Sequence, residues 1–250
     1  MVRGFYQLGT GIMTQNKALS TIANNISNAE TTGYKKQLVV TESFEDMIIA
    51  RIKAKPNDSS KGVFVGEKTM ARTVSETASI HTQGVLKETG RNLDVAIVGE
   101  GFFAIQTAQG TMYTRKGDFN VDEQGYLIQA NAGRVMGQNG PIRVGTEEVE
   151  FDRNGNVYAN GENVGRIAIY NFADYGVLTP VTEGYYSATG GAQQINSLLR
   201  GKTLEGSNVD MAEEITNAIA AQRELQTQSQ VLKMYDTTLQ KATTEIGRIN

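Results

Sequence analysis

The chain of 250 residues contains no cysteine, no tryptophan and a single histidine, His81. Without cysteine the fold has no disulfide bonds and no thiolate chemistry, and it lacks the best soft-metal ligands. One histidine cannot build a histidine-based metal site and gives little support to a His-dependent catalytic triad. His81 lies in a polar stretch, which predicts a surface position for its ring. The absence of cysteine fits the cytosol, and it also fits a chain that is exported unfolded.

Charge and hydrophobicity exclude further classes. The formal net charge is −3, so nothing in the chain attracts nucleic acid electrostatically. No apolar run approaches the ~18 residues that a membrane-spanning helix needs. No compact apolar block with a small-residue cleavage site follows Arg3, so we expect no cleaved signal peptide. Most of the 27 glycines lie between Gly84 and Gly206, so the two ends and the middle are built differently.

Both ends of the chain carry apolar residues at helical spacing. In the N-terminal segment they are Phe5, Leu8, Ile12, Leu19, Ile22 and Ile26, with Gln15 as a polar break. In the C-terminal segment every seventh residue is apolar, namely Met211, Ala218, Leu225, Leu232, Leu239 and Ile246, and we add Ile215 to this set. Such a narrow stripe needs a partner helix, from the opposite terminus or from another copy. We therefore interpret these residues as an assembly interface.

These patterns predict an α+β chain in which long N- and C-terminal amphipathic helices, a coiled-coil layer, flank a β-rich antiparallel central domain. The predicted parts are a coiled-coil helix (1–33), an extended linker region (34–83), the β-rich domain (84–190), a second linker (191–209) and a coiled-coil helix (210–250). Gly33 provides a left-handed end to the first helix. Asp210, with Glu213 three residues later, begins the last helix.

Between Gly84 and Ala173 the apolar period changes to two, which predicts short strands. We place them at 93–97, 102–105, 112–114, 126–128, 149–151, 157–158 and 166–170, and another at 37–41 before the domain. Three Asn-Gly dipeptides between strands, at 139–140, 154–155 and 160–161, are typical of hairpin turns because both residue types tolerate positive φ. Short strands separated by turns indicate an antiparallel sheet.

Several motifs suggest chemistry, and each has a simpler structural interpretation. The segment Gly99–Ala104 matches a dinucleotide fingerprint, but a β-like segment follows where that site needs a helix, so we predict a strand–turn–strand. Arg115 is expected to lie against an aromatic face in a structural role. Asp118 and Asp122 lack calcium-loop spacing and are assigned to turns. Four polar residues lie three positions from the C-terminal stripe and either set the register or face water; they are Gln222, Ser229, Asp236 and Thr243. We expect no catalytic, cofactor or metal site.

Three separated segments then point to one family. Residues 18–35 resemble the N-terminal signature of the flagellar rod and hook proteins, and residues 204–210 with the later Gln-Arg pair resemble the C-terminal signature. The matching positions are Asn24, Asn25, Asn28, Thr32, Gly33, Tyr34, Ser207, Asn208, Val209, Asp210, Gln222 and Arg223. The middle, from Thr89 to Phe119, is similar too. Residues 135–142 resemble the proximal-rod type, whereas 62–66 and 213–223 resemble the distal-rod type.

The resemblance implies a structural subunit of the bacterial flagellar basal-body rod rather than an enzyme. It implies unfolded export beyond the inner membrane through the flagellar export apparatus, and self-assembly through the terminal helices into a helical tube that transmits torque from motor to hook. Expected partners are further copies and other rod and hook proteins, with no nucleic acid and no small-molecule substrate. The alternatives are a secreted coiled-coil surface protein of the adhesin type, and an enzyme that binds a nucleotide at Gly99–Ala104.

Overall fold

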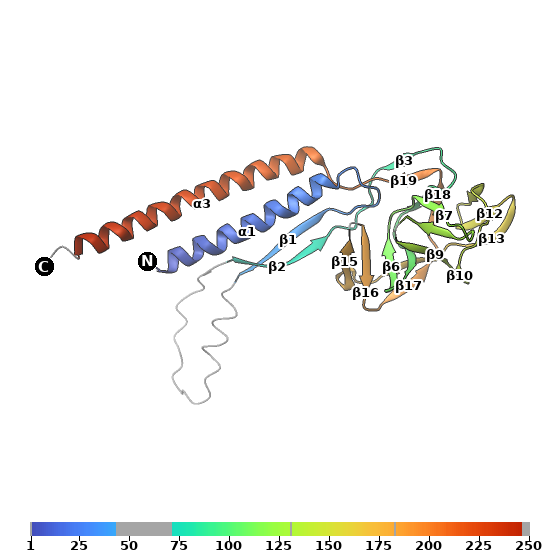
Figure 1. Cartoon of the computed structure of the whole chain (residues 1–250), viewed down its shortest axis with the longest axis horizontal. Coiled ribbons are helices and arrows are strands. Elements are labelled where there is room, and N and C mark those ends of the chain that lie inside the picture. Colours follow the sequence, from blue (N-terminus) through green and yellow to red (C-terminus); the bar gives the residue numbers. More distant parts are fainter. Residues whose placement is uncertain (1, 44–71, 131, 183, 247–250) are drawn as a thin grey trace, which may run out of the picture. The chain divides into compact units, whose positions relative to one another are not determined.

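The structure is a computed structural model that describes residues 2–43, 72–130, 132–182 and 184–246 (Figure 1). The chain divides into two compact units, one drawn from residues 1–26, 37–78 and 211–250 and the other from 27–36 and 79–210. The first unit holds two long helices that pack together, and the second holds most of the strands. The predicted α+β class, with long terminal helices and an antiparallel β-rich middle, is confirmed.

The two helices are α1 (Val2–Ser27) and α3 (Met211–Ile246), which run side by side in Figure 1. The predicted start of the last helix is confirmed, and Glu213 and Glu214 in its first turn suit the positive end of the helix dipole. No glycine or proline interrupts α3. Within the described ranges, no helix is both long enough and apolar enough to cross a membrane.

The strands are β1 (Gln37–Ser43), β2 (Arg72–Ser79), β3 (Leu86–Glu88), β4 (Val95–Val98), β5 (Phe102–Thr107), β6 (Gly110–Thr114), β7 (Phe119–Val121), β8 (Leu127–Gln129), β9 (Gly133–Gly137), β10 (Gly140–Pro141), β11 (Val149–Phe151), β12 (Asn156–Ala159), β13 (Glu162–Arg166), β14 (Ile169–Phe172), β15 (Leu178–Thr182), β16 (Tyr185–Ala188), β17 (Ala192–Ile195), β18 (Leu198–Gly201) and β19 (Thr203–Glu205). A single turn of 3-10 helix, Tyr175–Val177, precedes β15. Each strand predicted from the period of two overlaps an observed strand.

Strand β5 organises the second unit. In the described residues, a ten-stranded sheet runs in the order β15-β16-β6-β5-β9-β8-β7, with β14 also paired to β5, β17 to β14 and β10 to β9. Smaller sheets are β11-β12-β13, β18-β4, β19-β3 and, in the first unit, β1-β2. The pairings given for the second unit are antiparallel, as predicted.

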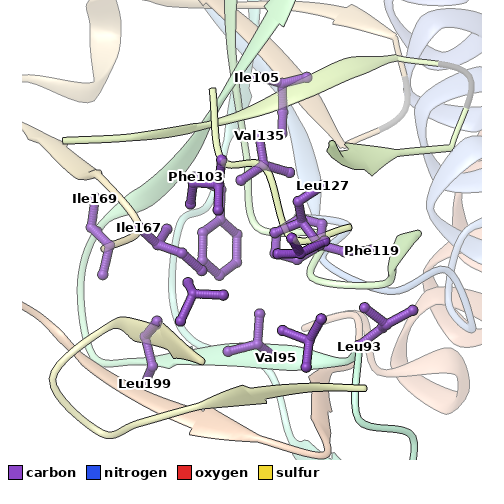
Figure 2. Packing of buried hydrophobic residues seen from close by; sticks show 14 of the residues in the cluster. Leu93, Val95, Phe103, Ile105, Phe119, Leu127, Val135, Ile167, Ile169 and Leu199 are labelled. Atoms are coloured by element: carbon purple, nitrogen blue, oxygen red, sulfur yellow. The ribbon is translucent and has the colours of Figure 1, made fainter. Parts of the chain in front are cut away.

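The core of the second unit lies on both faces of β5. Successive side chains of a strand point to opposite faces, so Phe103 and Ile105 enter one cluster while Phe102 and Ala104 enter another. Figure 2 shows the first cluster, where Phe103 lies among side chains from several strands and within 5.2 Å of the Phe119 ring centre. Burial on both faces explains why this segment is continuously apolar instead of alternating.

The turn predictions can be compared with the observed hairpins. Asn160 and Gly161, with φ of 50° and 83°, join β12 to β13 as predicted, because both residues adopt the left-handed region. At 139–140 the turn lies one residue earlier than predicted: Gly140 already pairs with Gly137. The predicted strand–turn–strand at Gly99–Ala104 is confirmed, since β5 follows the turn in place of a helix.

Two stretches differ from the sequence-based description. The segment 191–209, expected to be a linker, contains β17, β18 and β19. These strands pair with residues 86–98 and 169–172, so distant partners stabilise a stretch whose local sequence is weakly patterned. In the segment 34–83, the predicted strand at 37–41 is confirmed as β1, and the distal-type motif at 62–66 lies outside the described residues.

Gly33 provides a test of the chain path after α1. Its φ is +66°, and a Cβ at this position would lie 2.6 Å from the backbone nitrogen of Lys116. Gly90 has a similar φ of +75° but open space around its Cα.

We expect Gly90→Ala to lower the free energy of unfolding by about 1–2 kcal/mol, the cost of left-handed backbone for an L-residue. Gly33→Ala should cost clearly more, because the backbone of Lys116 cannot move aside freely. Denaturant unfolding of both variants checks this, and equal losses would contradict the close approach.

Candidate assembly interface

The packing of α1 against α3 follows a row of small residues on α1. A Cβ placed on Gly4 would lie 2.8 Å from Tyr235 Oη, and one on Gly11 would lie 3.1 Å from Gln228 Oε1. Fourteen residues after Gly11, Asn25 contacts Glu214, which is fourteen residues before Gln228. Steps of seven along α1 therefore match steps of seven back along α3, the pattern of an antiparallel coiled coil. The intermediate step places Ala18 opposite Ala221, which is buried.

One end of this row is polar and buried. The Asn25 amide donates to Glu214 Oε2 at 3.0 Å and to the backbone oxygen of Gln37 at 2.9 Å, while its oxygen accepts from the Gln37 backbone nitrogen at 3.0 Å. Asn25 and Glu214 are each only 1% exposed. A shift of either helix by one turn would break these bonds and leave a buried carboxylate without its amide partner. The contact thus fixes the helix register and ties β1 to α1.

The predicted stripe lies beside this row, and its side chains fall into three groups. Half-buried in the described structure are Leu8, Ile12, Leu19, Ile22, Ile26, Ala218, Leu225, Leu232 and Leu239. Exposed are Phe5, Met211 and Ile215, at 49%, 42% and 45% of their surface. The side chain of Ile246 lies outside the described residues. The helix pair therefore covers only part of the apolar stripe.

The four polar residues three positions from the C-terminal stripe were expected either to set the register or to face water. Gln222, Asp236 and Thr243 are exposed, which fits the second of these, and Ser229 is half-buried. The positions Glu214, Ala221, Gln228 and Tyr235 face α1 instead. Sequence reasoning looked for apolar residues and missed this row, whose members share only a spacing of seven. The matching row Gly4, Gly11, Ala18 and Asn25 on α1 was the available signal.

A second buried polar group lies in the other unit, and we call Lys35, Arg115 and Glu205 the ionic cluster. Glu205 accepts from Lys35 Nζ at 2.5 Å, from Arg115 at 3.3 Å and from the backbone nitrogen of Gly84 at 3.0 Å. These three side chains are at most 2% exposed. Lys35 also donates to the Thr82 carbonyl at 2.7 Å, and Arg115 to the Gly99 carbonyl at 2.8 Å. The cluster therefore joins five separate stretches of chain.

Burial dominates the electrostatics of this cluster. Removal from water lowers the pKa of Lys35 and of Arg115, and the neighbouring Glu205 carboxylate opposes the decrease in both. Arg115 lies 5.2 Å from the centre of the Phe102 ring, so the predicted placement of its guanidinium against an aromatic face is confirmed. Lys35 and Glu205 lie inside the two terminal signatures, but sequence reasoning gave neither a role. Each stretch holds one further charged residue, Glu30 and Asp210, so charge alone did not single out Lys35 and Glu205.

Several family-motif residues surround the ionic cluster. Asn208 donates to the backbone oxygens of Ile80 and Thr82 at 2.8 and 3.2 Å and accepts from the Lys36 backbone nitrogen at 2.7 Å. The remaining motif positions are Asn28, Gly33 and Tyr34, which are buried, Thr32, Ser207 and Val209, which are half-buried, and Asn24, Asp210, Gln222 and Arg223, which are exposed. The buried ones hold the path of the chain between α1 and β1 and before α3.

The polar neighbours of His81 predicted a ring at the surface, but the residue is half-buried. Its ring packs against Tyr175, Tyr186 and Phe102, with ring centres 4.9, 5.1 and 5.5 Å away. Its Nδ1 is buried and makes no hydrogen bond among the described residues. Burial, together with the nearby charges of Lys35 and Arg115, lowers the pKa of His81 from 6.5 to about 4. At neutral pH the ring is thus uncharged and structural. Asp122 belongs to a turn, as predicted, and accepts from the Gln124 and Tyr126 backbone nitrogens. The predicted turn around 119–121 is wrong, because these residues form β7 and Asp118 makes a β-bridge with Asp94.

Comparison with known proteins gives the same pattern in three segments. The profile of the "Flagella basal body rod protein" family matches residues 5–35, that of the "Flagellar hook protein FlgE/F/G D1 domain" matches 96–159, and that of the "Flagellar basal body rod FlgEFG protein C-terminal" matches 200–245. The two terminal segments contain both partners of the Asn25–Glu214 contact, and Lys35 and Glu205 of the ionic cluster.

Curated relatives match over nearly the full chain. The chain is 35% identical over 247 residues to the flagellar basal-body rod protein FlgG of Agrobacterium fabrum. The alignment covers 91% of this chain and 93% of that protein. It is 32% identical over 264 residues to FlgG of Bacillus subtilis, with 96% and 98% covered. It is 33% identical over 251 residues to the flagellar basal-body rod protein FlgF of Caulobacter vibrioides, with 95% of each covered.

The ionic cluster predicts a large effect of one neutralising substitution. Glu205→Gln should leave Lys35 and Arg115 buried without their counter-charge and lower the free energy of unfolding by about 3–5 kcal/mol. The matched control is Glu88→Gln, which removes an exposed ion pair with Arg200 and should cost less than about 1 kcal/mol. Chemical denaturation of the two variants measures both losses. A Glu205→Gln loss as small as that of the control would refute the structural role of the cluster.

His81 predicts an acid-sensitive stability. The folded pKa of about 4 lies below the unfolded value of 6.5, so the unfolded chain binds the extra proton first as the pH falls. Stability from this group is complete above pH 6.5 and decreases towards pH 4, by roughly 2 kcal/mol between pH 7 and 5. His81→Phe keeps an aromatic ring and should remove this part of the pH dependence. Denaturant titrations at both pH values test it; an unchanged slope in the variant would assign the effect to other groups.

Proposed function

The chain belongs to the flagellar basal-body rod protein family and is a structural subunit of that rod, not an enzyme; from this premise we propose that copies of it assemble through α1 and α3 into a helical tube. Membership of the family implies assembly with other rod and hook subunits. The proposal adds that the stripe residues form the contacts between copies, and that the tube transmits torque from motor to hook.

The observation that carries the proposal is the incomplete burial of the apolar stripe. After α1 and α3 have packed together, Phe5, Met211 and Ile215 still expose 42–49% of their surface and nine further stripe residues are only half-buried. Fully burying one Leu or Ile side chain contributes roughly 1.5–3 kcal/mol. Contacts with neighbouring copies would provide that burial, repeated over several residues of each subunit.

The ionic cluster supports the mechanical part of the proposal. The chain enters the second unit through residues 27–36 and leaves it before Met211, and the cluster joins these two stretches through Lys35 and Glu205. A load on either terminal helix would therefore pass into the β-rich unit through a buried network as well as through the backbone. Separating the two stretches would leave charged side chains buried without their partners, which costs free energy. The network therefore resists separation.

Three further features belong to the same proposal. Export beyond the inner membrane through the flagellar export apparatus suits a chain that contains no cysteine. The division assigns assembly to the ends: a coiled-coil layer (1–33 and 210–250), a connecting region (34–83) and a β-rich domain (84–190), to which the segment 191–209 adds β17, β18 and β19. The family-motif residues around Asn25, Gly33 and Asn208 hold the helices and the β-rich unit in the form that assembles.

The two alternative functions have less support. A nucleotide-binding enzyme would need a helix after Gly101, where the structure has β5. A secreted adhesin with a coiled-coil stalk would need no paired N-terminal helix, whereas Asn25 of α1 makes a buried contact with α3. Rod family membership fits that pairing directly.

Substitution of one stripe residue tests the proposal. Leu232→Asp places a charge in the half-buried seam, so rods should fail to assemble and motility should be lost. The β-rich unit should keep its thermal transition, because Leu232 lies in the other unit. Thr227→Asp, at an exposed position of the same helix, is the matched control and should leave motility intact. Normal motility and rod assembly with Leu232→Asp would show that the seam is wrongly placed.

A further inference from the structure

A cavity of about 430 Å³ opens beside the ionic cluster in the second unit. Its walls come from the end of β2 and the stretch that follows, the turn before β5, the residue after β6 and the turn of 3-10 helix. Gln83 and Glu100 in the lining are exposed, whereas Arg115 is only 2% exposed. The cavity therefore leads from the surface to a buried guanidinium. Its volume lies within the range of about 300–1,000 Å³ that small-molecule sites occupy.

One side of the Arg115 guanidinium lacks a partner. Both of its hydrogen bonds use Nη1, which donates to the Gly99 carbonyl at 2.8 Å and to Glu205 at 3.3 Å. Its Nε is buried and makes no hydrogen bond among the described residues. Arginine stays protonated in proteins, so Nε carries a hydrogen, and a buried donor without an acceptor costs free energy. Because Arg115 lines the cavity, an acceptor has room to bind there.

His81 brings a second unpaired atom to the same cavity. Its ring lines the cavity, and its Nδ1 is buried without a hydrogen bond in the part of the chain that the structure describes. A neutral imidazole carries a hydrogen on one of its two nitrogens, so Nδ1 can serve as a donor. Within the described ranges four buried side-chain atoms lack a hydrogen bond, and two of them belong to His81 and Arg115. Two such atoms from separate segments at one cavity indicate a polar ligand that contacts both.

The charge of the site favours an anion. The ionic cluster contains two buried bases and one buried acid, so it keeps one positive charge in excess. Among the described residues that line the cavity Glu100 is the only acid, but its carboxylate accepts from the Asn171 amide at 2.9 Å and forms no ion pair with Arg115. A planar, singly charged carboxylate can accept one hydrogen bond on each oxygen, whereas the charge of Glu100 disfavours a dianion such as phosphate.

We propose that this cavity binds a small carboxylic acid as its carboxylate, with one oxygen accepting from Arg115 Nε and the other from His81 Nδ1. The ligand supplies both missing acceptors and compensates the excess charge of the ionic cluster. It also joins the stretch after β2 to the residue after β6, because His81 and Arg115 come from these two places. The inference is separate from assembly through the helices, since every residue that lines the cavity lies in the second unit.

Acetate is the simplest probe of this site, and His81 is its reporter. The chain has a single histidine, so the ring protons of His81 can be followed in NMR spectra of the full-length protein at neutral pH. We expect acetate to shift these signals along a saturating curve, because the bound carboxylate contacts the ring. Acetamide has nearly the same shape without the charge and should give no saturable shift. A shift that stays linear with acetate concentration, or an equal effect of acetamide, would overturn the proposal.

Two substitutions identify the groups that act on acetate. Arg115→Lys keeps a positive charge beside Glu205 but lacks the Nε–H donor, so acetate should bind more weakly by about tenfold or more. Glu100→Gln removes the acid from the lining and should strengthen binding by about threefold. Glu162→Gln is the matched control, because it changes the net charge equally at an exposed position that does not line the cavity. It should leave the acetate affinity unchanged.

The Glu100 variant keeps the test decisive even where Arg115→Lys does not fold. Glu100 is exposed, so Glu100→Gln should retain the thermal transition of the unaltered protein. Equal acetate affinities in Glu100→Gln and Glu162→Gln would place acetate outside the cavity. Binding by Glu100→Gln but not by the unaltered chain would show that the Glu100 carboxylate itself occupies the site. Either result would overturn the proposal.

Discussion

A carboxylate that is shut off from water must be surrounded by donors, and Glu205 is fully buried in this protein. Its partners come from the segment after α1, from the approach to β3 and from the end of β6. The need to compensate one charge thus brings together stretches separated by as many as 170 residues. Gly33, with its left-handed backbone, and Asn208, with its contacts to two carbonyls, complete the same arrangement. Most of the residues that mark the family therefore serve the path of the chain.

The helix pair follows a related rule. Glycine and alanine on α1 allow α3 to approach closely, which gains contact but specifies little about register. The buried contact between Asn25 and Glu214 supplies the specificity, because a shifted register would leave polar groups unpaired. In this helix pair, small residues allow the close approach and one polar pair sets the register, whereas many coiled coils use large apolar residues for both. The larger apolar side chains remain available on other edges of both helices.

This division of labour connects the fold to the function. A rod subunit has to hold its own terminal helices together and still present apolar surface to its neighbours. Here the small-residue row serves the first need, and the half-buried and exposed stripe residues are suited to the second. In the β-rich unit, β5 is buried on both faces and separates two apolar clusters, so this unit stabilises itself. In the proposed assembly, the apolar stripes at the ends concern surfaces between molecules, whereas the apolar strands in the middle concern the interior of one.

The sequence alone determined the element types, because apolar periodicity reflects which face of a helix or strand avoids water. It gave the limits of α3, the strands from 93 to 172 and the turn at Asn160-Gly161. It also carried the family, through motifs near both ends. Only the tertiary structure decided that His81 packs among aromatic rings, that residues 192–205 form strands, and that Glu214 and Tyr235 face α1. These features depend on partners far along the chain, and local composition cannot specify which distant group will complete a hydrogen bond or cover a ring.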